Sequence, residues 1–145
     1  MASRGKKGDR ENVEKTVAKP TLALIATRPG PLQNGLVALM TTMPQVNAVI
    51  VAEEAVSALR MIAEHLPTLV LLEMALPGEE TRTVLKQIKA AWPLTRCIVL
   101  ANDVRQQQEA KAAGADVVLL KGFSAAKLIA TVEELLSQKE QGRAK

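Results

Sequence analysis

The chain has 145 residues, of which 48% are hydrophobic and 23% charged, and its formal net charge is +4. This length suits a single domain with a sizeable core. No apolar run approaches the roughly 20 residues that a membrane span needs. A single cysteine excludes a disulfide-stapled scaffold and fits a reducing compartment such as the cytoplasm. One Trp, one Phe and no Tyr leave few rings on which single-stranded nucleic acid could stack.

The positive charge is concentrated at the two ends of the chain. Residues 1–20 hold six basic and three acidic groups and residues 137–145 add a net +2, so residues 21–136 carry −1. Residues 1–19 are polar and lack apolar periodicity, which predicts a disordered basic arm. We expect a domain over residues 20–137 and a flexible tail over residues 138–145. The arm could touch nucleic acid, but its mixed charge favours a solubilising role, and nucleic acid is not the expected partner.

In chain order, five short apolar runs alternate with longer amphipathic stretches. Each run is apolar on both faces, which is typical of buried parallel strands. The runs are Leu22–Ala26, Ala48–Ala52, Leu69–Leu72, Cys97–Ala101 and Val117–Leu120. The stretches between and after them repeat apolar residues at helical spacing.

The last two amphipathic stretches also carry signals for where a helix begins and ends. Asp103 with Gln106 resembles a capping box, Gly114 stands where a helix-terminating glycine belongs, and Ser124 is a plausible N-cap. Five strands alternating with five helices predict an α/β fold, a doubly wound parallel sheet covered on both faces.

The site of such a sheet is expected at the carboxyl ends of its strands. No strand leads into a GxGxxG or GxxxxGK[ST] loop. A single histidine and the lack of a metal-ligand spacing disfavour a His-based triad or a zinc site. We therefore expect no enzyme activity, no cofactor and no metal. What remains at the strand ends is the carboxylate of Glu73 and the ammonium of Lys121.

Three segments resemble response regulator receiver domains. Leu69–Gly78 (LVLLEMALPG) is similar to their phosphoacceptor strand and loop, and Gly114–Phe123 (GADVVLLKGF) to their fifth strand, which normally ends in Lys-Pro. Ala91–Leu100 (AWPLTRCIVL) is similar to receivers that precede a helix-turn-helix output domain. The resemblance extends from about Thr21 to Leu136. It implies a flavodoxin-like three-layer sandwich with the strand order 2-1-3-4-5.

The same resemblance shows that the family's metal and phosphoacceptor residues are replaced. Glu73 stands where active receivers have the aspartate nucleophile. Ala26 and Thr27 stand where they have an acidic pair for Mg²⁺, and the cationic Arg28 follows. Mg²⁺ requires oxygen ligands, usually carboxylates. Without the metal, a transferred phosphoryl group loses its main stabiliser. The resemblance therefore implies an atypical receiver, a pseudo-receiver that is not phosphorylated.

The residues that relay phosphorylation in the family are replaced as well. Ala101 takes the place of the Ser or Thr that contacts the phosphoryl group, and Val118 that of the aromatic switch residue, so only Lys121 keeps its family identity. We expect Lys121 and Glu73 to form an ion pair of small value. Glu73 could instead act as a permanent mimic of the phosphorylated aspartate. We favour the plain ion pair, because neither Ala101 nor Val118 can relay the charge.

Arg28 has three possible roles in this arrangement. It could pair with Glu73, or bind an anion such as a small metabolite in the vacated pocket. It could also be a solvated loop arginine held by Glu53 or Glu54, and we favour this last role.

The resemblance implies a protein-interaction module of two-component signalling and phosphorelays, located in the cytoplasm and acting without phosphorylation. Receivers commonly bind partners or dimerise through a face that corresponds here to the Asp103–Ala113 helix, the fifth strand and the last helix. We expect a signalling or regulatory protein, or a second copy of the chain, on that face. Two alternatives remain: a sensor of small anions or metabolites, and a transcription-associated regulator that contacts nucleic acid through its basic arms.

Overall fold

The computed structural model describes residues 21–78 and 80–144, with side chains as far as residue 137. In this part of the chain five strands alternate with five helices. The strands are β1 (Leu22–Ala26), β2 (Ala48–Ala52), β3 (Leu69–Glu73), β4 (Arg96–Ala101) and β5 (Val117–Leu120). The helices are α2 (Pro31–Thr42), α3 (Ala55–His65), α4 (Thr81–Ala91), α5 (Val104–Ala112) and α6 (Ala125–Ala144). The predicted basic arm over residues 1–19 lies outside the described residues.

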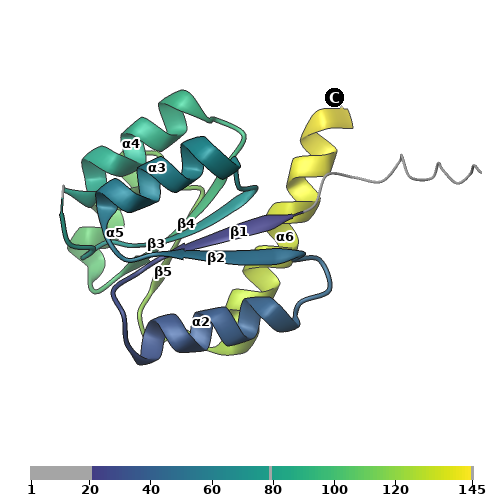
Figure 1. Ribbon diagram of the computed structural model, residues 1–145, viewed down its shortest axis with the longest axis horizontal. Helices are drawn as coiled ribbons and strands as arrows, with labels where there is room; N and C mark the ends of the chain where they lie inside the picture. The colour runs from purple at the N-terminus through teal and green to yellow at the C-terminus, as the bar shows by residue number, and fades with distance from the viewer. Residues whose placement is uncertain (1–20, 79, 145) are drawn as a thin grey trace, which may run out of the picture.

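The strands form one parallel sheet in the order β2-β1-β3-β4-β5 (Figure 1), which confirms the predicted fold class and strand order. β1 pairs with both β2 and β3, and β3 pairs with β4 so that Glu73 lies beside Leu100. Because all strands point the same way, their carboxyl ends meet at one edge of the sheet. Glu73 lies near the middle of that edge.

Helices cover both faces of the sheet, because each strand sends alternate side chains to opposite sides. On one face Leu24 and Leu72 pack against residues of α3, α4 and α5. On the other face Ile25 and Leu71 pack against α2 and α6 (Figure 1). Burial of each large apolar side chain contributes about 1.5–3 kcal/mol relative to exposure. The two cores hold the sheet rigid, and with it the ends of its strands.

The predicted caps at Asp103, Ser124 and Gly114 are confirmed, but the capping box is not closed, because the Gln106 side chain accepts the Asn102 backbone N–H and not that of Asp103. The Asp103 carboxylate accepts the Gln106 backbone N–H at 2.8 Å, and the Ser124 hydroxyl oxygen accepts that of Lys127 at 3.0 Å. Gly114 follows the end of α5 with φ +109°, a conformation that favours glycine. These contacts set where α5 ends and where α5 and α6 begin. The segments after β4 and β5 are thereby held in place.

α6 extends to Ala144, so its backbone is helical through most of the predicted tail. The flexibility of that tail stays a prediction. No helix among the described residues is both long and apolar enough to span a membrane.

A cluster of charged side chains, here called the amino-edge cluster, lies at the opposite end of the sheet and consists of Lys89, Arg96 and Asp116. Asp116 accepts hydrogen bonds from Lys89 at 2.9 Å, from Arg96 at 3.4 Å and from the Cys97 backbone N–H at 2.7 Å. Lys89 also donates to the carbonyls of Pro93 and Thr95. The cluster ties the end of α4 to β4 and to the start of β5.

Candidate functional site

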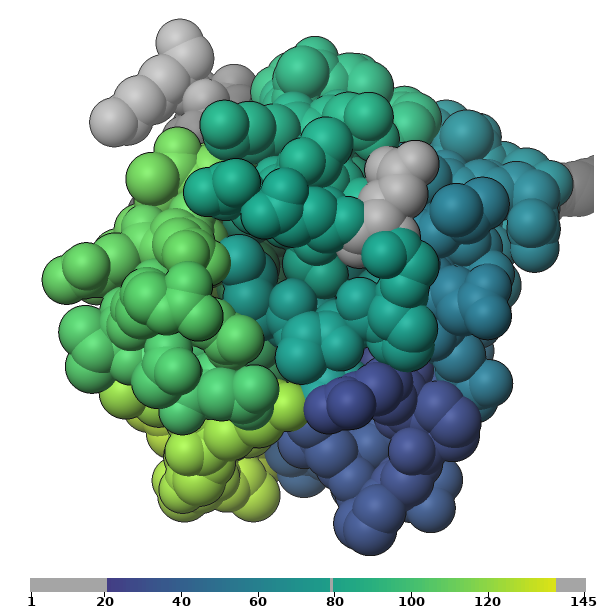
Figure 2. Space-filling view, turned by 90° about the vertical axis from the view of Figure 1, so that its left-hand side faces the viewer, coloured from purple at the N-terminus to yellow at the C-terminus, as the bar shows by residue number. Residues whose placement is uncertain are grey.

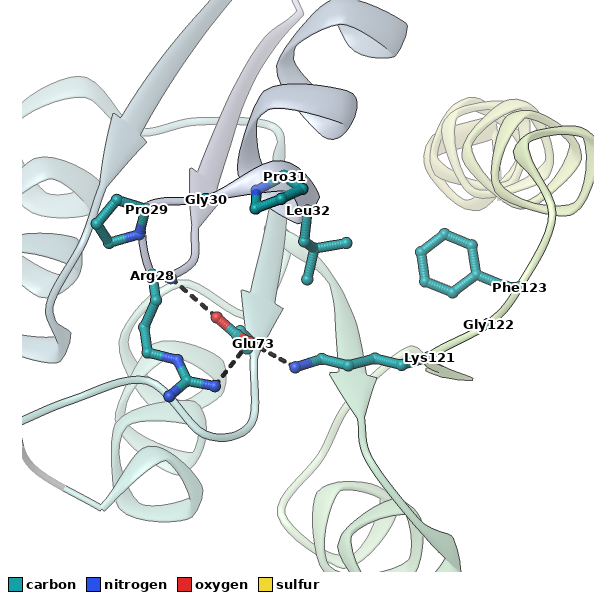
Figure 3. A pocket seen from close by; sticks show the side chains of 9 residues that line it. All are labelled: Arg28, Pro29, Gly30, Pro31, Leu32, Glu73, Lys121, Gly122 and Phe123. Atoms are coloured by element: carbon teal, nitrogen blue, oxygen red, sulfur yellow. Dashed lines mark hydrogen bonds and ion pairs between the residues drawn. The ribbon is translucent and has the colours of Figure 1, made fainter.

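The carboxylate of Glu73 is buried at the carboxyl edge of the sheet with two cations against it (Figure 3). Its Oε2 accepts a hydrogen bond from Lys121 Nζ at 2.5 Å and lies 3.6 Å from the Arg28 guanidinium. Its Oε1 accepts the Arg28 backbone N–H at 2.8 Å. Arg28 follows β1 and Lys121 follows β5, so the topology brings three distant segments together. We call these three residues the carboxyl-edge cluster.

The cluster keeps Glu73 ionised. Burial raises the pKa of Glu73, but hydrogen bonds from Lys121 and from the Arg28 backbone, with the charges of both side chains, lower it more. The net result is a pKa below the ordinary value of 4.5. One carboxylate and two cations leave the cluster with a net charge of +1.

The two positions where the resemblance places the acidic pair of active receivers are apolar or neutral here. Ala26 and Thr27 are fully buried. The Thr27 hydroxyl has no hydrogen-bond partner among the described residues. The Thr27 carbonyl accepts a hydrogen bond from the Gln33 side chain at 3.1 Å. This part of the edge therefore offers one unpaired hydroxyl and no carboxylate.

The predicted relay positions lie near the cluster but add no polar side chain to it. Ala101 ends β4 and is fully buried, and its carbonyl accepts the Lys121 backbone N–H at 2.8 Å. Val118 is half-buried and packs against the core beneath α3, α4 and α5. Both side chains are aliphatic and cannot form a hydrogen bond or an ion pair with Glu73.

A pocket of about 460 Å³ opens beside Glu73. Figure 2 shows this edge of the molecule, where the segments after β1, β3 and β5 meet. The walls of the pocket are formed by Arg28, Pro29, Gly30, Pro31, Leu32, Glu73, Lys121, Gly122 and Phe123. Of these, Leu32 was predicted only as a helix residue, and the Pro and Gly residues and Phe123 were not predicted as site residues. The only sequence signal was the Arg-Pro-Gly-Pro run before α2.

The predicted ion pair of Glu73 with Lys121 is confirmed, and the favoured role of Arg28 was wrong. Among the described residues Arg28 forms its ion pair with Glu73, and neither Glu53 nor Glu54 holds it. The physical reason is the Arg28 backbone N–H, which binds Glu73 and turns the loop toward β3. This leaves Arg28 as one wall of the pocket.

The sequence of this chain matches one known protein family. The family model described as "Response regulator receiver domain" matches residues 31–133. The chain belongs to this family. No curated protein matches the chain.

Solved structures of receivers resemble the domain closely in fold. A CheY-like response regulator receiver domain from Methanospirillum hungatei JF-1 has a TM-score of 0.78 at 19% identity, covering 86% of this chain and 99% of that one. A signal receiver domain of an HD domain-containing protein from Pseudomonas fluorescens Pf-5 has a TM-score of 0.77 at 21% identity, covering 85% and 99%. A DNA-binding response regulator of the LuxR family from Staphylococcus aureus has a TM-score of 0.71 at 22% identity, covering 79% and 98%. At these identities the likeness concerns the fold.

The Mg²⁺ of the family does not fit the residues of this receiver. Among the described residues, Glu73 is the only carboxylate in the walls of the pocket, and both of its oxygens already accept hydrogen bonds. Two cations stand beside it, and the unpaired Thr27 hydroxyl is a neutral oxygen. Within the described ranges, no three His, Cys, Asp or Glu side chains gather into a metal site. A divalent cation here would meet net positive charge in place of the carboxylates it prefers.

Proposed function

We propose that this receiver domain acts in two-component-type signalling as a protein-interaction module whose state does not depend on phosphorylation. The observation that carries the proposal is the pairing of Glu73 with Arg28 and Lys121. Lys121 already neutralises a carboxylate, and no acidic pair recruits a metal. A phosphodonor would therefore find neither a free nucleophile nor the ion that stabilises phosphoryl transfer.

The interaction role is supported by the surface formed by α5, β5 and α6, which corresponds to the face that receivers commonly use. Val104 at the start of α5 is 56% exposed, and Leu120 at the end of β5 is 39% exposed. Apolar side chains of this kind contribute to binding when a partner covers them. We propose that a signalling protein or a second copy of the chain binds there.

The phosphorylation claim is tested by incubating the chain with acetyl phosphate and Mg²⁺ and measuring its intact mass. We expect no phosphoryl adduct, while a receiver with the aspartate and the acidic pair, treated in parallel, gains one. The Glu73→Asp variant restores the nucleophile without the metal ligands and should also stay unmodified. A phosphoryl adduct on the natural chain that Glu73→Ala removes would overturn the proposal.

The interaction claim is tested with a matched pair of exposed valines. Val104→Asp places a charge on the α5–β5–α6 face, and Val56→Asp places the same charge on α3, where Val56 is 55% exposed. Sedimentation reports self-association, and affinity capture followed by a binding measurement with the purified protein reports a partner. We expect Val104→Asp to weaken the association and Val56→Asp to leave it unchanged. Equal effects of the two variants would contradict the assignment of the face.

A further inference from the structure

The pocket beside Glu73 combines positive charge with apolar walls. Its volume of about 460 Å³ falls within the roughly 300–1,000 Å³ typical of small-molecule sites. Arg28 and Lys121 lie on either side of the Glu73 carboxylate (Figure 3). Leu32 lies in the first turn of α2, and Phe123 lies in the segment between β5 and α6. Their side chains face each other across the pocket (Figure 3). A ligand that fills the pocket must match both surfaces.

The cations retain hydrogen-bond donors that Glu73 does not use. Lys121 has three N–H donors, and one acceptor is bound to it among the described residues. The Arg28 guanidinium has five N–H donors and makes only the 3.6 Å ion pair with Glu73 in this part of the chain. Its side chain is 52% exposed, so its outer donors are accessible. An additional anion can therefore bind here without displacing Glu73.

The charge of the cluster selects the kind of anion. Two cations against one carboxylate leave +1, which a monoanion neutralises. A dianion such as phosphate would leave excess negative charge close to Glu73. The apolar contacts of Leu32 and Phe123, with Pro29 and Pro31 near them, give no gain to an ion that lacks an apolar body.

We propose that the pocket binds a small organic monocarboxylate, with its carboxylate on the donors of Arg28 and Lys121 that Glu73 leaves unused and its apolar body between Leu32 and Phe123. This goes beyond the interaction role and does not depend on it, because binding is measured on the chain alone, without partner or phosphodonor. An anion held here would bridge the segments after β1 and β5.

The test uses four probes on the full chain: 2-naphthoate, its neutral analogue 2-naphthamide, acetate and inorganic phosphate. Binding is followed by the amide resonances of Leu32, Gly122 and Phe123 and by calorimetry. We expect 2-naphthoate to shift these three amides in a saturable way, and 2-naphthamide and acetate each to bind at least about tenfold more weakly, since each lacks one half of the recognition. Phosphate should bind more weakly than 2-naphthoate.

The matched variants are Arg28→Gln in the pocket and Arg82→Gln outside it. Arg82 is also an exposed arginine paired with a glutamate, Glu80. We expect Arg28→Gln to weaken 2-naphthoate binding about tenfold, the loss of one charged hydrogen bond, and Arg82→Gln to leave it unchanged. Phe123→Ala should weaken 2-naphthoate more than acetate. Equal binding of the amide and the acid, tighter binding of phosphate, an unaffected Arg28→Gln, or no amide shifts at the solubility limit of 2-naphthoate would each overturn the proposal.

Discussion

The two edges of the sheet carry the same three kinds of charge and use them differently. Each edge has a cluster of one carboxylate, one lysine and one arginine: Asp116, Lys89 and Arg96 at the amino edge, and Glu73, Lys121 and Arg28 at the carboxyl edge. All three donors of Lys89 have acceptors, two of them backbone carbonyls. Lys121 has one acceptor in the described chain.

The two lysines therefore differ in saturation, which distinguishes the amino-edge cluster from the proposed binding site. At the amino edge, Asp116 and two backbone carbonyls accept hydrogen bonds from all three donors of Lys89, although the buried Arg96 Nε has no partner among the described residues. At the carboxyl edge, Arg28 and Lys121 keep donors that have no acceptor among the described residues, beside the pocket. Two clusters of the same composition therefore differ in how far the lysine is saturated and in the pocket beside it.

The largest expected effect is on stability, from Asp116→Asn at the amino edge. The variant leaves the partly buried Lys89 and Arg96 without their counter-charge, and we expect a loss of about 3 kcal/mol in the free energy of unfolding, measured with urea. Cys97 provides a second readout. Burial raises the pKa of its thiol to about 12, with Lys89 opposing and Asp116 adding to the rise, so alkylation should be slow in the natural chain and faster in the variant. If stability and alkylation both stay unchanged, the amino-edge cluster is not structural.

At the carboxyl edge, Glu73→Gln should cost about 2 kcal/mol at neutral pH, because Lys121 and Arg28 lose a charged acceptor. The folded pKa of Glu73 lies below its ordinary 4.5. Its contribution is therefore present above about pH 4.5 and disappears as the pH falls through the folded pKa. Unfolding measured against pH should show the two proteins converging in acid. A difference that persists below that range would mean that Glu73 acts through packing.

Two glycines, one at each edge, allow the packing of the two edges to be compared through smaller changes in stability. Gly114 (φ +109°) lies beside Lys89 of the amino edge, and a Cβ there would come within 3.3 Å of the Lys89 Cγ. Gly122 (φ +102°) lines the pocket, and a Cβ there would meet nothing within 4 Å. Both alanine variants carry backbone strain of about 1–2 kcal/mol, and Gly114→Ala adds the contact. We expect Gly114→Ala to be the less stable in thermal unfolding; the reverse order would contradict the difference in packing.

The smallest effect on stability should come from Arg28→Gln. The Arg28 side chain is half-exposed and its ion pair spans 3.6 Å, so we expect a loss below about 0.5 kcal/mol that salt reduces further. Urea unfolding at low and high salt measures it. A loss as large as that of Glu73→Gln would show that Arg28 is held for the fold and is not available to a ligand.

The fold could be predicted from the sequence because its signals are local. Three of the five strands have the predicted bounds, and β3 and β4 each differ by one residue. Short runs that are apolar on both faces, and the capping residues Asp103, Gly114 and Ser124, specify the elements without knowledge of the tertiary structure. The strand order came from the family resemblance, since the alternation alone allows others.

The site could be predicted only in part, because its geometry depends on loops. The pair Glu73–Lys121 follows from two strand ends. The partner of Arg28 could not be predicted in this way. β1 lies between β2 and β3, so acids at the end of either neighbouring strand were within reach of Arg28. The pocket walls and the amino-edge cluster come from segments far apart in the chain, and no motif marks them.

The helix α6 runs antiparallel to the strands of the sheet, and this has a practical consequence. This helix begins at the carboxyl edge and returns along the sheet, so Ala144 lies at the same end of the molecule as the start of β1 (Figure 1). A tether, dye or sensor surface attached at that end is separated from the pocket by the length of the sheet. The domain can therefore be immobilised through α6 with its pocket turned toward the solution, which makes it suited to measuring weak ligands directly.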